Sequence, residues 1–423
     1  MVEPERARDR RIWLIPLGTV PIAILWRTHP VRAPDAHLGA DLLATYLLVW
    51  ALILLSSRRS LEETRKGFLV TSVVLAGSVA LLEMLALLRL VDFRVLFPIP
   101  LHEPWDHPGN HLDPKLLHIH QPHDDFLWGG IRYRYDRHGL RNAVDVEKAE
   151  VVVIGDSFIE GIGVAEKDLV TTRLGEELGR TVANIAQAWY GPQQELELLR
   201  RYGLPLHPRV CVWAFFEGND LWDVARYKAV LPEWPALSRS KSSFWPRSFT
   251  RNGTAALRRL TRPDETAPDP EPLSGVFRRR DGEEVRMVFW DGGHWLSKED
   301  EAALGDLRGI VRSACRLCRD HEAGFLFVFI PSKYRVYRDI ASFEAHAAPL
   351  YWVVNDLPQR LAEIVRDEAP GAGFLDLTPA FREEARQGVQ LYFDYDNHWT
   401  PEGHAAAAAA IARSLPREVN GGA

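Results

Sequence analysis

Three things are scarce in this sequence, and each scarcity excludes a class of protein. The 423 residues include only three cysteines, too few for a disulfide framework. Basic residues do not outnumber acidic ones: the formal net charge is −6, so we expect no nucleic-acid partner. Long apolar runs are absent after about residue 90. The composition, 46% hydrophobic and 26% charged, is that of a folded protein with a sizeable core.

Spacings typical of metal ligands are also lacking. Cys315 and Cys318 form a C-x-x-C, but both lie in a helical pattern without a second pair, so we expect buried apolar side chains. The segment 101–125 contains six histidines, yet their spacing fits no known ligand pattern. We therefore interpret this segment as a surface connector, and we expect neither a metal nor an organic cofactor.

Long apolar runs are confined to the first ninety residues, at 12–26, 42–57 and 68–88. Only the third reaches the roughly 20 residues that span a bilayer core. The alternative is three buried core helices, but the charged stretch between the second and third runs is typical of an aqueous loop. No small-x-small cleavage site follows the first run, which argues against a signal peptide. We predict a membrane anchor over residues 1–92 with about three transmembrane helices.

The orientation of this anchor follows from its basic flanks. Arginine and lysine are concentrated before the first run and between the second and third, and such flanks favour the cytoplasm. Three spans then place the rest of the chain outside the cytoplasm. We predict an inner-membrane protein with a cytoplasmic N-terminus and a periplasmic or extracellular catalytic domain.

Beyond a His- and Pro-rich connector at 93–149, apolar β-rich runs alternate with amphipathic stretches. This rhythm predicts an α/β domain over residues 150–420 with a parallel sheet covered on both faces. Its strands are expected at 151–154, 181–185, 210–216, 325–330 and 374–377. Residues 221–298 interrupt the rhythm with a tryptophan-rich insertion, which includes an Asp281-Gly282 hairpin signal. The insertion either forms a lid or a substrate groove beside the site, or has no part in the function of the site.

Candidate catalytic groups follow the strands of this sheet. "VVVIGDSF" ends a buried strand at Gly155 and presents Ser157, which needs a neighbouring base to act as a nucleophile. "YFDYDNHWTPEGH" offers His398 as that base and Asp396 to orient it. Gly191 and Asn219 follow two other strands, where a backbone N–H and a side-chain amide can serve an oxyanion hole.

Each of these residues also has a structural interpretation. Ser157 could cap a helix, Asn219 could belong to a turn, and His398 could be structural. His404 falls within the last helix and is interpreted as structural. Asp156 and Asp220, beside the motif residues, are interpreted as local hydrogen-bonding partners.

The ordered blocks GDS, Gly, GxND and a C-terminal Asp/His pair resemble the SGNH (GDSL-type) hydrolase superfamily over roughly residues 150–415. This resemblance implies a flavodoxin-like three-layer sandwich with Ser157 as nucleophile and His398 as general base. It also implies oxyanion donors from the Ser157 N–H, Gly191 and Asn219. The superfamily usually places its aspartate three residues before the histidine, where this chain has Tyr395. The Asp-x-His spacing is instead similar to alginate O-acetyltransferase-like members, which favours Asp396, with Asp394 in reserve.

The sequence therefore predicts a membrane-anchored serine esterase that acts on acylated carbohydrate or lipid outside the cytoplasm. The first alternative is an O-acyltransferase that acetylates an exported polysaccharide, with a membrane-bound partner protein as acyl donor. The second is a catalytically silent glycan-binding or assembly protein.

Overall fold

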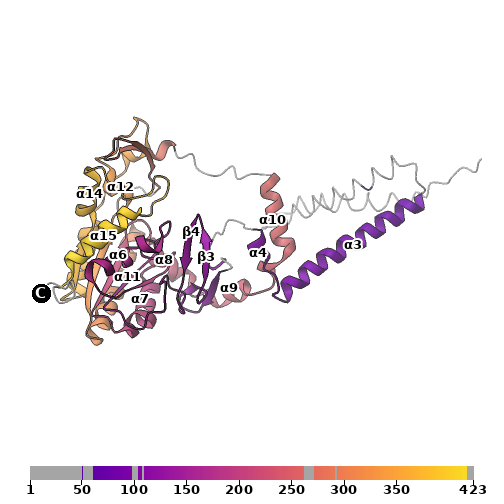
Figure 1. Cartoon of the computed structure of the whole chain (residues 1–423), viewed down its shortest axis with the longest axis horizontal. Coiled ribbons are helices and arrows are strands. Elements are labelled where there is room, and N and C mark those ends of the chain that lie inside the picture. Colours follow the sequence, from indigo (N-terminus) through magenta and orange to yellow (C-terminus); the bar gives the residue numbers. More distant parts are fainter. Residues whose placement is uncertain are drawn as a thin grey trace, which may run out of the picture. The chain divides into compact units, whose positions relative to one another are not determined.

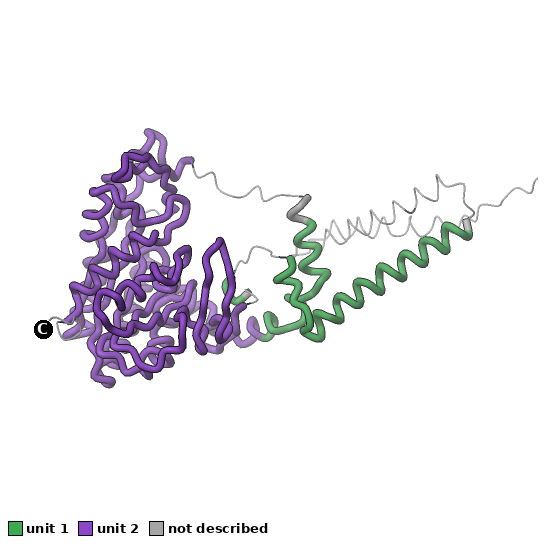
Figure 2. The backbone as a smooth tube through the Cα atoms, in the orientation of Figure 1, with its two compact units in different colours: residues 1–108, 239–267 green, residues 109–238, 268–423 purple. Residues whose placement is uncertain are grey.

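The computed structural model describes residues 50, 61–97, 103–106, 109–261, 271–290 and 293–416. It divides the chain into two compact units (Figure 2). Unit 1 comprises residues 1–108 and 239–267, and unit 2 comprises residues 109–238 and 268–423. The predicted domain boundaries remain predictions, but residues 239–267 of the predicted insertion belong to the same unit as the N-terminal segment.

Unit 2 is built around a five-stranded, all-parallel sheet (Figure 1). The predicted α/β fold with a parallel sheet is therefore confirmed, and all five strands occur within a residue or two of their predicted bounds. The spatial order is β11-β10-β7-β5-β6, which in chain order is the 2-1-3-4-5 arrangement of flavodoxin-like sheets. The strands are β5 (Val151–Gly155), β6 (Val182–Ala186), β7 (Val210–Phe216), β10 (Gly324–Ile330) and β11 (Gly373–Asp376).

Helices cover both faces of this sheet. In β5, Val151 and Val153 contribute to one hydrophobic cluster and Val152 and Ile154 to the other, because successive side chains of a strand point to opposite faces. The first cluster includes residues of α6 (Val170–Leu178), α12 (Lys333–Tyr337), α14 (Thr378–Arg386) and α15 (Pro401–Ser414). The second includes residues of α7 (Pro192–Leu198), α8 (Asp220–Val230), α11 (Lys298–Asp320) and α13 (Leu357–Glu368).

Three two-stranded antiparallel sheets accompany the main sheet in unit 2. One of them is the hairpin predicted at Asp281-Gly282, where Gly282 has φ +90°. The other two lie in the predicted connector, and there His118 and His120 are buried. From Gly109 onward, this segment is packed structure. The strands are β1 (Asn110–Asp113), β2 (Leu117–His120), β3 (Asp125–Trp128), β4 (Ile131–Arg134), β8 (Ser274–Arg278) and β9 (Glu284–Val288).

Unit 1 is dominated by helix α3 (Leu61–Leu87). Within Glu62–Leu87, an 18-residue window has a mean hydropathy of 2.1 and contains no buried residue. The 26 residues rise about 39 Å, which is enough to cross a bilayer by length and composition. The helix contains the predicted apolar run 68–88 except for its last residue. It begins seven residues earlier, within the charged stretch that was interpreted as a loop. Its charged first turn carries a Glu62–Lys66 ion pair of 2.8 Å, and glutamates are favourable at a helix N-terminus. The predicted spans at 12–26 and 42–57 lie outside the described residues, except for Trp50.

The end of α3 is joined to the segment that follows residue 239. Glu83 accepts hydrogen bonds from Ser248 Oγ at 2.9 Å and from Thr250 N at 2.7 Å. Phe249 packs edge-on against Phe93, with 5.2 Å between ring centroids. The helices in this contact are α4 (Phe93–Leu96) and α10 (Phe249–Thr261). The two remaining α-helices of the described residues are α5 (Ser157–Glu160) and α9 (Trp234–Lys241).

Candidate active site

The nucleophile candidate lies where strand β5 turns into helix α5. Every residue of β5 is buried, and a Cβ at Gly155 would lie 2.6 Å from Cγ1 of Ile159, so only glycine permits this close turn. Asp156 caps α5 by accepting the N–H of Phe158 at 3.0 Å, which makes it a local hydrogen-bonding partner. Ser157 is half-buried, and its backbone N–H has no hydrogen-bond partner among the described residues.

The base candidate is carried by a tight loop between α14 and the last helix, α15. Tyr392 and Trp399 form an antiparallel bridge, and Phe393 N donates to His398 O at 3.0 Å, so the loop closes on itself. The ring of Phe158 lies 5.1 Å from the His398 ring and 5.0 Å from the Trp399 ring. The loop is thereby packed directly against α5.

The structure brings the predicted serine, histidine and aspartate together. His398 Nε2 lies 2.8 Å from Ser157 Oγ, and His398 Nδ1 lies 2.5 Å from Asp396 Oδ1. The alternative acceptor for the serine hydroxyl, Asp156 Oδ2, is farther away at 3.4 Å. If Nδ1 carries the proton and donates to Asp396, the Nε2 lone pair faces the serine hydroxyl.

Between the two aspartates, only Asp396 contacts the histidine ring. Asp396 Oδ1 also accepts the backbone N–H of His398 at 2.7 Å. Burial by itself would raise the pKa of this carboxyl, but the hydrogen bonds from His398 and its charge lower the pKa to about 2. Asp394 instead accepts the N–H of Tyr395 at 2.9 Å, and its carbonyl accepts the N–H of Val288 at 2.7 Å.

The two other oxyanion candidates are both adjacent to Asp223. The Asn219 amide donates to Asp223 Oδ2 at 2.6 Å. Gly191 packs so closely against α8 that an added Cβ would lie 2.5 Å from Asp223 Cβ. Its N–H makes a long 3.3 Å hydrogen bond to Gln194 Oε1. Both predicted donors thus belong to one neighbourhood, although each has a protein partner in this structure.

Sequence reasoning missed a set of buried carboxyl groups behind these donors. Burial raises the pKa values of Glu195 and Asp220 well above their usual range, and mutual repulsion adds to this effect. Burial also raises the pKa of Asp223 to about 7. The Glu195 carboxyl group accepts a hydrogen bond from Trp213 Nε1 at 2.6 Å. The Asp220 carboxyl group accepts the backbone N–H of Phe216 at 2.7 Å and is thus a local hydrogen-bonding partner. Burial thus favours the neutral forms of Glu195 and Asp220, which oppose a developing oxyanion less than carboxylates would.

A second missed residue is Glu160, at the end of α5. Its carboxylate accepts Tyr135 OH at 2.6 Å and the N–H of Ala188, and it lies 3.3 Å from His120 Nε2. Burial alone would raise its pKa, but these partners lower the pKa to about 2. The negative charge of Glu160 is thus stabilised by residues of the predicted connector and by the loop before Gly191, and these contacts link both segments to α5.

The remaining histidines and the cysteines have structural positions. His404 is buried in α15, where its Nδ1 accepts the N–H of Val170 at 3.1 Å, and burial lowers its pKa to about 3. Cys211, Cys315 and Cys318 are buried and free, as expected of apolar side chains. Among the described residues, no group of three or more His, Cys, Asp or Glu side chains is arranged to hold a metal ion.

A parallel α/β sheet with a serine, a histidine and an aspartate in contact beside it is the arrangement that the SGNH resemblance implies. Residues 289–423, which include His398 and Asp396, match the model of a family described as the SGNH hydrolase-like domain of acetyltransferase AlgX. The SGNH resemblance, with its similarity to acetyltransferase members, is thereby confirmed over residues 289–423, which are similar to that domain.

Solved structures and curated proteins add little to this identification. A G-D-S-L family lipolytic protein from Desulfitobacterium hafniense is 12% identical with a TM-score of 0.34, covering 63% of this chain and 98% of its own. An acetyl xylan esterase from Butyrivibrio proteoclasticus is 11% identical with a TM-score of 0.32, covering 67% and 68%. A carbohydrate esterase family 2 enzyme from Corynascus thermopiles is 12% identical with a TM-score of 0.34, covering 69% and 71%. No curated protein matches the chain. Similarities this weak say nothing about substrate.

Proposed function

We propose that this protein transfers acyl groups through an acyl-enzyme formed on Ser157. The observation that carries the proposal is the continuous hydrogen-bonded line from Ser157 Oγ to His398 Nε2 and from His398 Nδ1 to Asp396. A serine hydroxyl becomes an effective nucleophile only when a positioned base removes its proton. This geometry provides such a base at 2.8 Å.

In the first half of the reaction, Ser157 Oγ attacks the ester carbonyl carbon while His398 Nε2 takes the hydroxyl proton. Asp396 stabilises the imidazolium that forms. The oxyanion is bound by the free N–H of Ser157, with the Asn219 amide and the Gly191 N–H as further donors once they turn from their present partners. His398 then returns its proton to the leaving alcohol, and the acyl group remains on Ser157.

In the second half, His398 removes a proton from an acceptor hydroxyl, which attacks the acyl-enzyme. We favour a carbohydrate hydroxyl as acceptor and acetyl as the acyl group, because the matched family is named for an acetyltransferase. The exposed side chains of Trp189 and Trp222 lie two and three residues from Gly191 and Asn219, where aromatic rings can stack on sugars. Water as acceptor gives the second candidate function, a carbohydrate esterase.

We further propose that helix α3 anchors the protein in a membrane, with unit 2 outside the cytoplasm. The length and hydropathy of α3 support an anchor, and the basic residues that precede it support this orientation. A membrane-bound partner is then a suitable acyl donor, because acyl donors made in the cytoplasm do not reach the far side unaided.

The test uses the full chain in detergent and its Ser157→Ala variant, with Ser313→Ala on helix α11 as matched control. We expect p-nitrophenyl acetate to be cleaved by the wild type and by Ser313→Ala, but not by Ser157→Ala. Oligosaccharides are then added as acceptors and analysed by mass spectrometry. A serine-dependent gain of one acetyl group identifies a transferase, and release of acetate alone identifies an esterase. Equal activity of the wild type and Ser157→Ala would refute the acyl-enzyme and favour a silent glycan-binding protein.

A further inference from the structure

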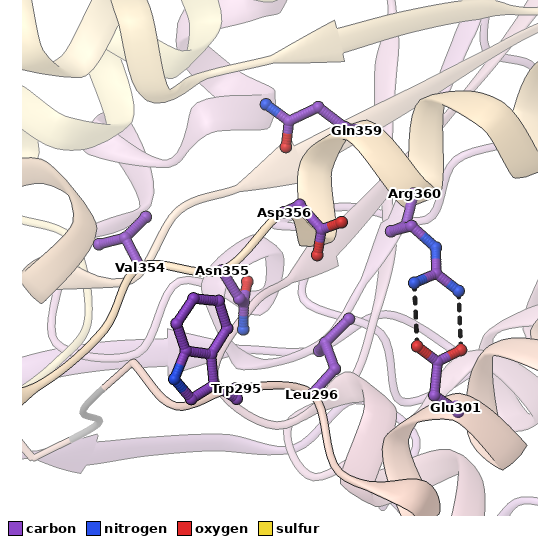
Figure 3. Close-up of a pocket in the computed structure, with 8 residues that line it drawn as sticks. All are labelled: Trp295, Leu296, Glu301, Val354, Asn355, Asp356, Gln359 and Arg360. Atoms are coloured by element: carbon purple, nitrogen blue, oxygen red, sulfur yellow. Dashed lines mark hydrogen bonds and ion pairs between the residues drawn. The ribbon is translucent and has the colours of Figure 1, made fainter.

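Unit 2 has a pocket that contains none of the proposed catalytic residues (Figure 3). Its volume is about 550 Å³, and it lies where helices α11 and α13 begin. The lining residues are Trp295, Leu296, Glu301, Val354, Asn355, Asp356, Gln359 and Arg360. Figure 3 shows Trp295 on one side of it and the Glu301–Arg360 pair on the other. This volume lies within the range of small-molecule sites.

The exposed side chain of Trp295 is presented on a fixed backbone. Its side chain is 73% exposed, although the residues before it are anchored. Val353 N donates to Gly293 O at 3.0 Å, and Asn355 Nδ2 donates to His294 O at 2.9 Å. A Cβ at Gly293 would lie 1.8 Å from Val353 O, so this close approach requires glycine. An exposed indole held in place in this way loses little conformational entropy when a ligand stacks on it.

Polar groups with unused hydrogen-bonding capacity surround this indole. Among the described residues, the side chains of Asp356 and Gln359 have no hydrogen-bond partner, so they can accept from and donate to hydroxyl groups. Glu301 and Arg360 neutralise each other through hydrogen bonds of 2.9 and 2.7 Å. An aromatic face beside acid and amide groups suits a ring that has apolar faces and hydroxyl edges, which is the chemistry of a sugar.

The charge of the lining restricts which sugar can bind. Because the Glu301–Arg360 pair has no net charge, Asp356 leaves the pocket with one negative charge. A uronate carboxylate would be placed near this charge without an unpaired cation from the lining residues to bind it. The lining therefore favours an uncharged sugar unit over a polyuronate.

The pocket is also connected to the catalytic loop. Trp290 Nε1 donates to Tyr395 O at 2.5 Å, next to Asp396, and Trp295 follows only five residues later. Five residues span at most about 18 Å, a distance that a short oligosaccharide can bridge. A second connection runs through Arg335. Its guanidinium group donates hydrogen bonds to Asn355 Oδ1 at 2.9 Å and to Glu217 Oε1 at 2.8 Å, and Glu217 lies two residues before Asn219.

We infer that the Trp295 pocket is a subsite for a neutral sugar unit of the carbohydrate substrate, remote from the unit that is acylated. The inference rests on the proposed function for its link to acyl transfer, but the binding itself does not require catalysis. The pocket would hold a glycan chain so that a hydroxyl several units away reaches the acyl-enzyme.

The experiment measures binding by isothermal titration calorimetry to the full chain in detergent carrying Ser157→Ala, so that no turnover occurs. The probes are cellohexaose, xylohexaose and mannohexaose, with hexamannuronate as the charged comparison. We expect at least one neutral hexasaccharide to bind, and Trp295→Ala to weaken it by about fivefold to tenfold. Trp295→Phe should restore most of the affinity. Trp128→Ala, which removes another exposed tryptophan from unit 2, should leave it unchanged.

Three results would overturn the inference. They are the failure of every neutral hexasaccharide to bind, binding that Trp295→Ala leaves intact, and hexamannuronate binding that depends on Trp295 as strongly. Cleavage of p-nitrophenyl acetate by Trp295→Ala with Ser157 intact should equal that of the wild type. If the wild type binds the sugar but Ser157 proves irrelevant to turnover, the acyl-transfer proposal fails while the subsite stands.

Discussion

The side-chain amide of Asn219 donates to the carboxyl group of Asp223 across 2.6 Å, one helical turn further along the chain. The Cβ of Asp223 also occupies the space that a side chain at position 191 would need. One carboxyl-bearing residue therefore touches both candidate oxyanion donors that lie outside the serine loop. Four predictions follow from the groups around it and around His398.

Replacing Asn219 by alanine removes one proposed oxyanion donor. If its amide turns to the substrate oxygen in the transition state, kcat for p-nitrophenyl acetate should fall by about 10²–10³ with little change in KM. Steady-state kinetics measure this effect directly. A loss smaller than about fivefold would mean that Asn219 only positions Asp223.

Gly191→Ala introduces a methyl group 2.5 Å from Asp223 Cβ and 3.1 Å from its carbonyl carbon. Overpacking of this kind costs about 1–3 kcal/mol of unfolding free energy, and it should also lower kcat. Gly305→Ala is the matched control, because nothing lies within 4 Å of the added methyl group, and alanine favours helix α11. Urea unfolding should therefore show opposite shifts for the two variants.

The Asp223 carboxyl should make stability depend on pH. Burial raises its pKa to about 7, whereas an unfolded aspartate titrates near 3.9. Between these values the folded protein keeps a proton that the unfolded chain releases, so this carboxyl lowers stability as pH rises, with the full cost present above about pH 7. Asp223→Asn should therefore gain stability relative to wild type across this window, by up to about 1.4 kcal/mol per pH unit.

This difference is measured as the thermal midpoint of each protein between about pH 4 and about pH 8. Asp306→Asn, an exposed carboxylate paired with Lys228, is the control. A constant difference between Asp223→Asn and wild type over the whole range would contradict the raised pKa.

The two aspartates of the catalytic loop should differ in their effect on rate. Asp396→Asn removes the acceptor of the 2.5 Å contact to His398 Nδ1, and loss of the orienting acid is expected to lower kcat by about 10²–10⁴. Asp394→Asn changes a side chain that contacts only the neighbouring N–H, so kcat should stay within about threefold. Equal losses in both variants would leave the assignment of Asp396 without support.

Much of the sheet domain could be predicted from the sequence because most of its strands are buried. Continuous apolar runs such as Val210–Phe216 can only be satisfied inside a two-sided sheet, and the glycine and polar residues after them mark the strand ends. Ser157 could be found for the same reason, since it follows a buried strand. His398 was found instead from the Asp/His block before the last helix.

What could not be predicted depends on partners distant in sequence. The histidines of the connector are polar and lie in a proline-rich segment, which is typical of a surface connector. Yet His120 is buried beside Glu160, and that partner lies forty residues later. The pairing of Asn219 with Asp223 left a signal, the four-residue helical spacing, but nothing local indicated that the acid would be buried. The start of α3 was missed because charged residues were interpreted as loop.

The contact between Ser157 and His398 joins residues 241 positions apart. The candidate nucleophile directly follows the first strand of the sheet, and the candidate base lies in the last loop before the final helix. During synthesis, more than half of the chain is therefore made after Ser157 and before His398. If Ser157 and His398 act as proposed, activity requires the C-terminal loop to be docked, and a chain that ends before His398 would be inactive.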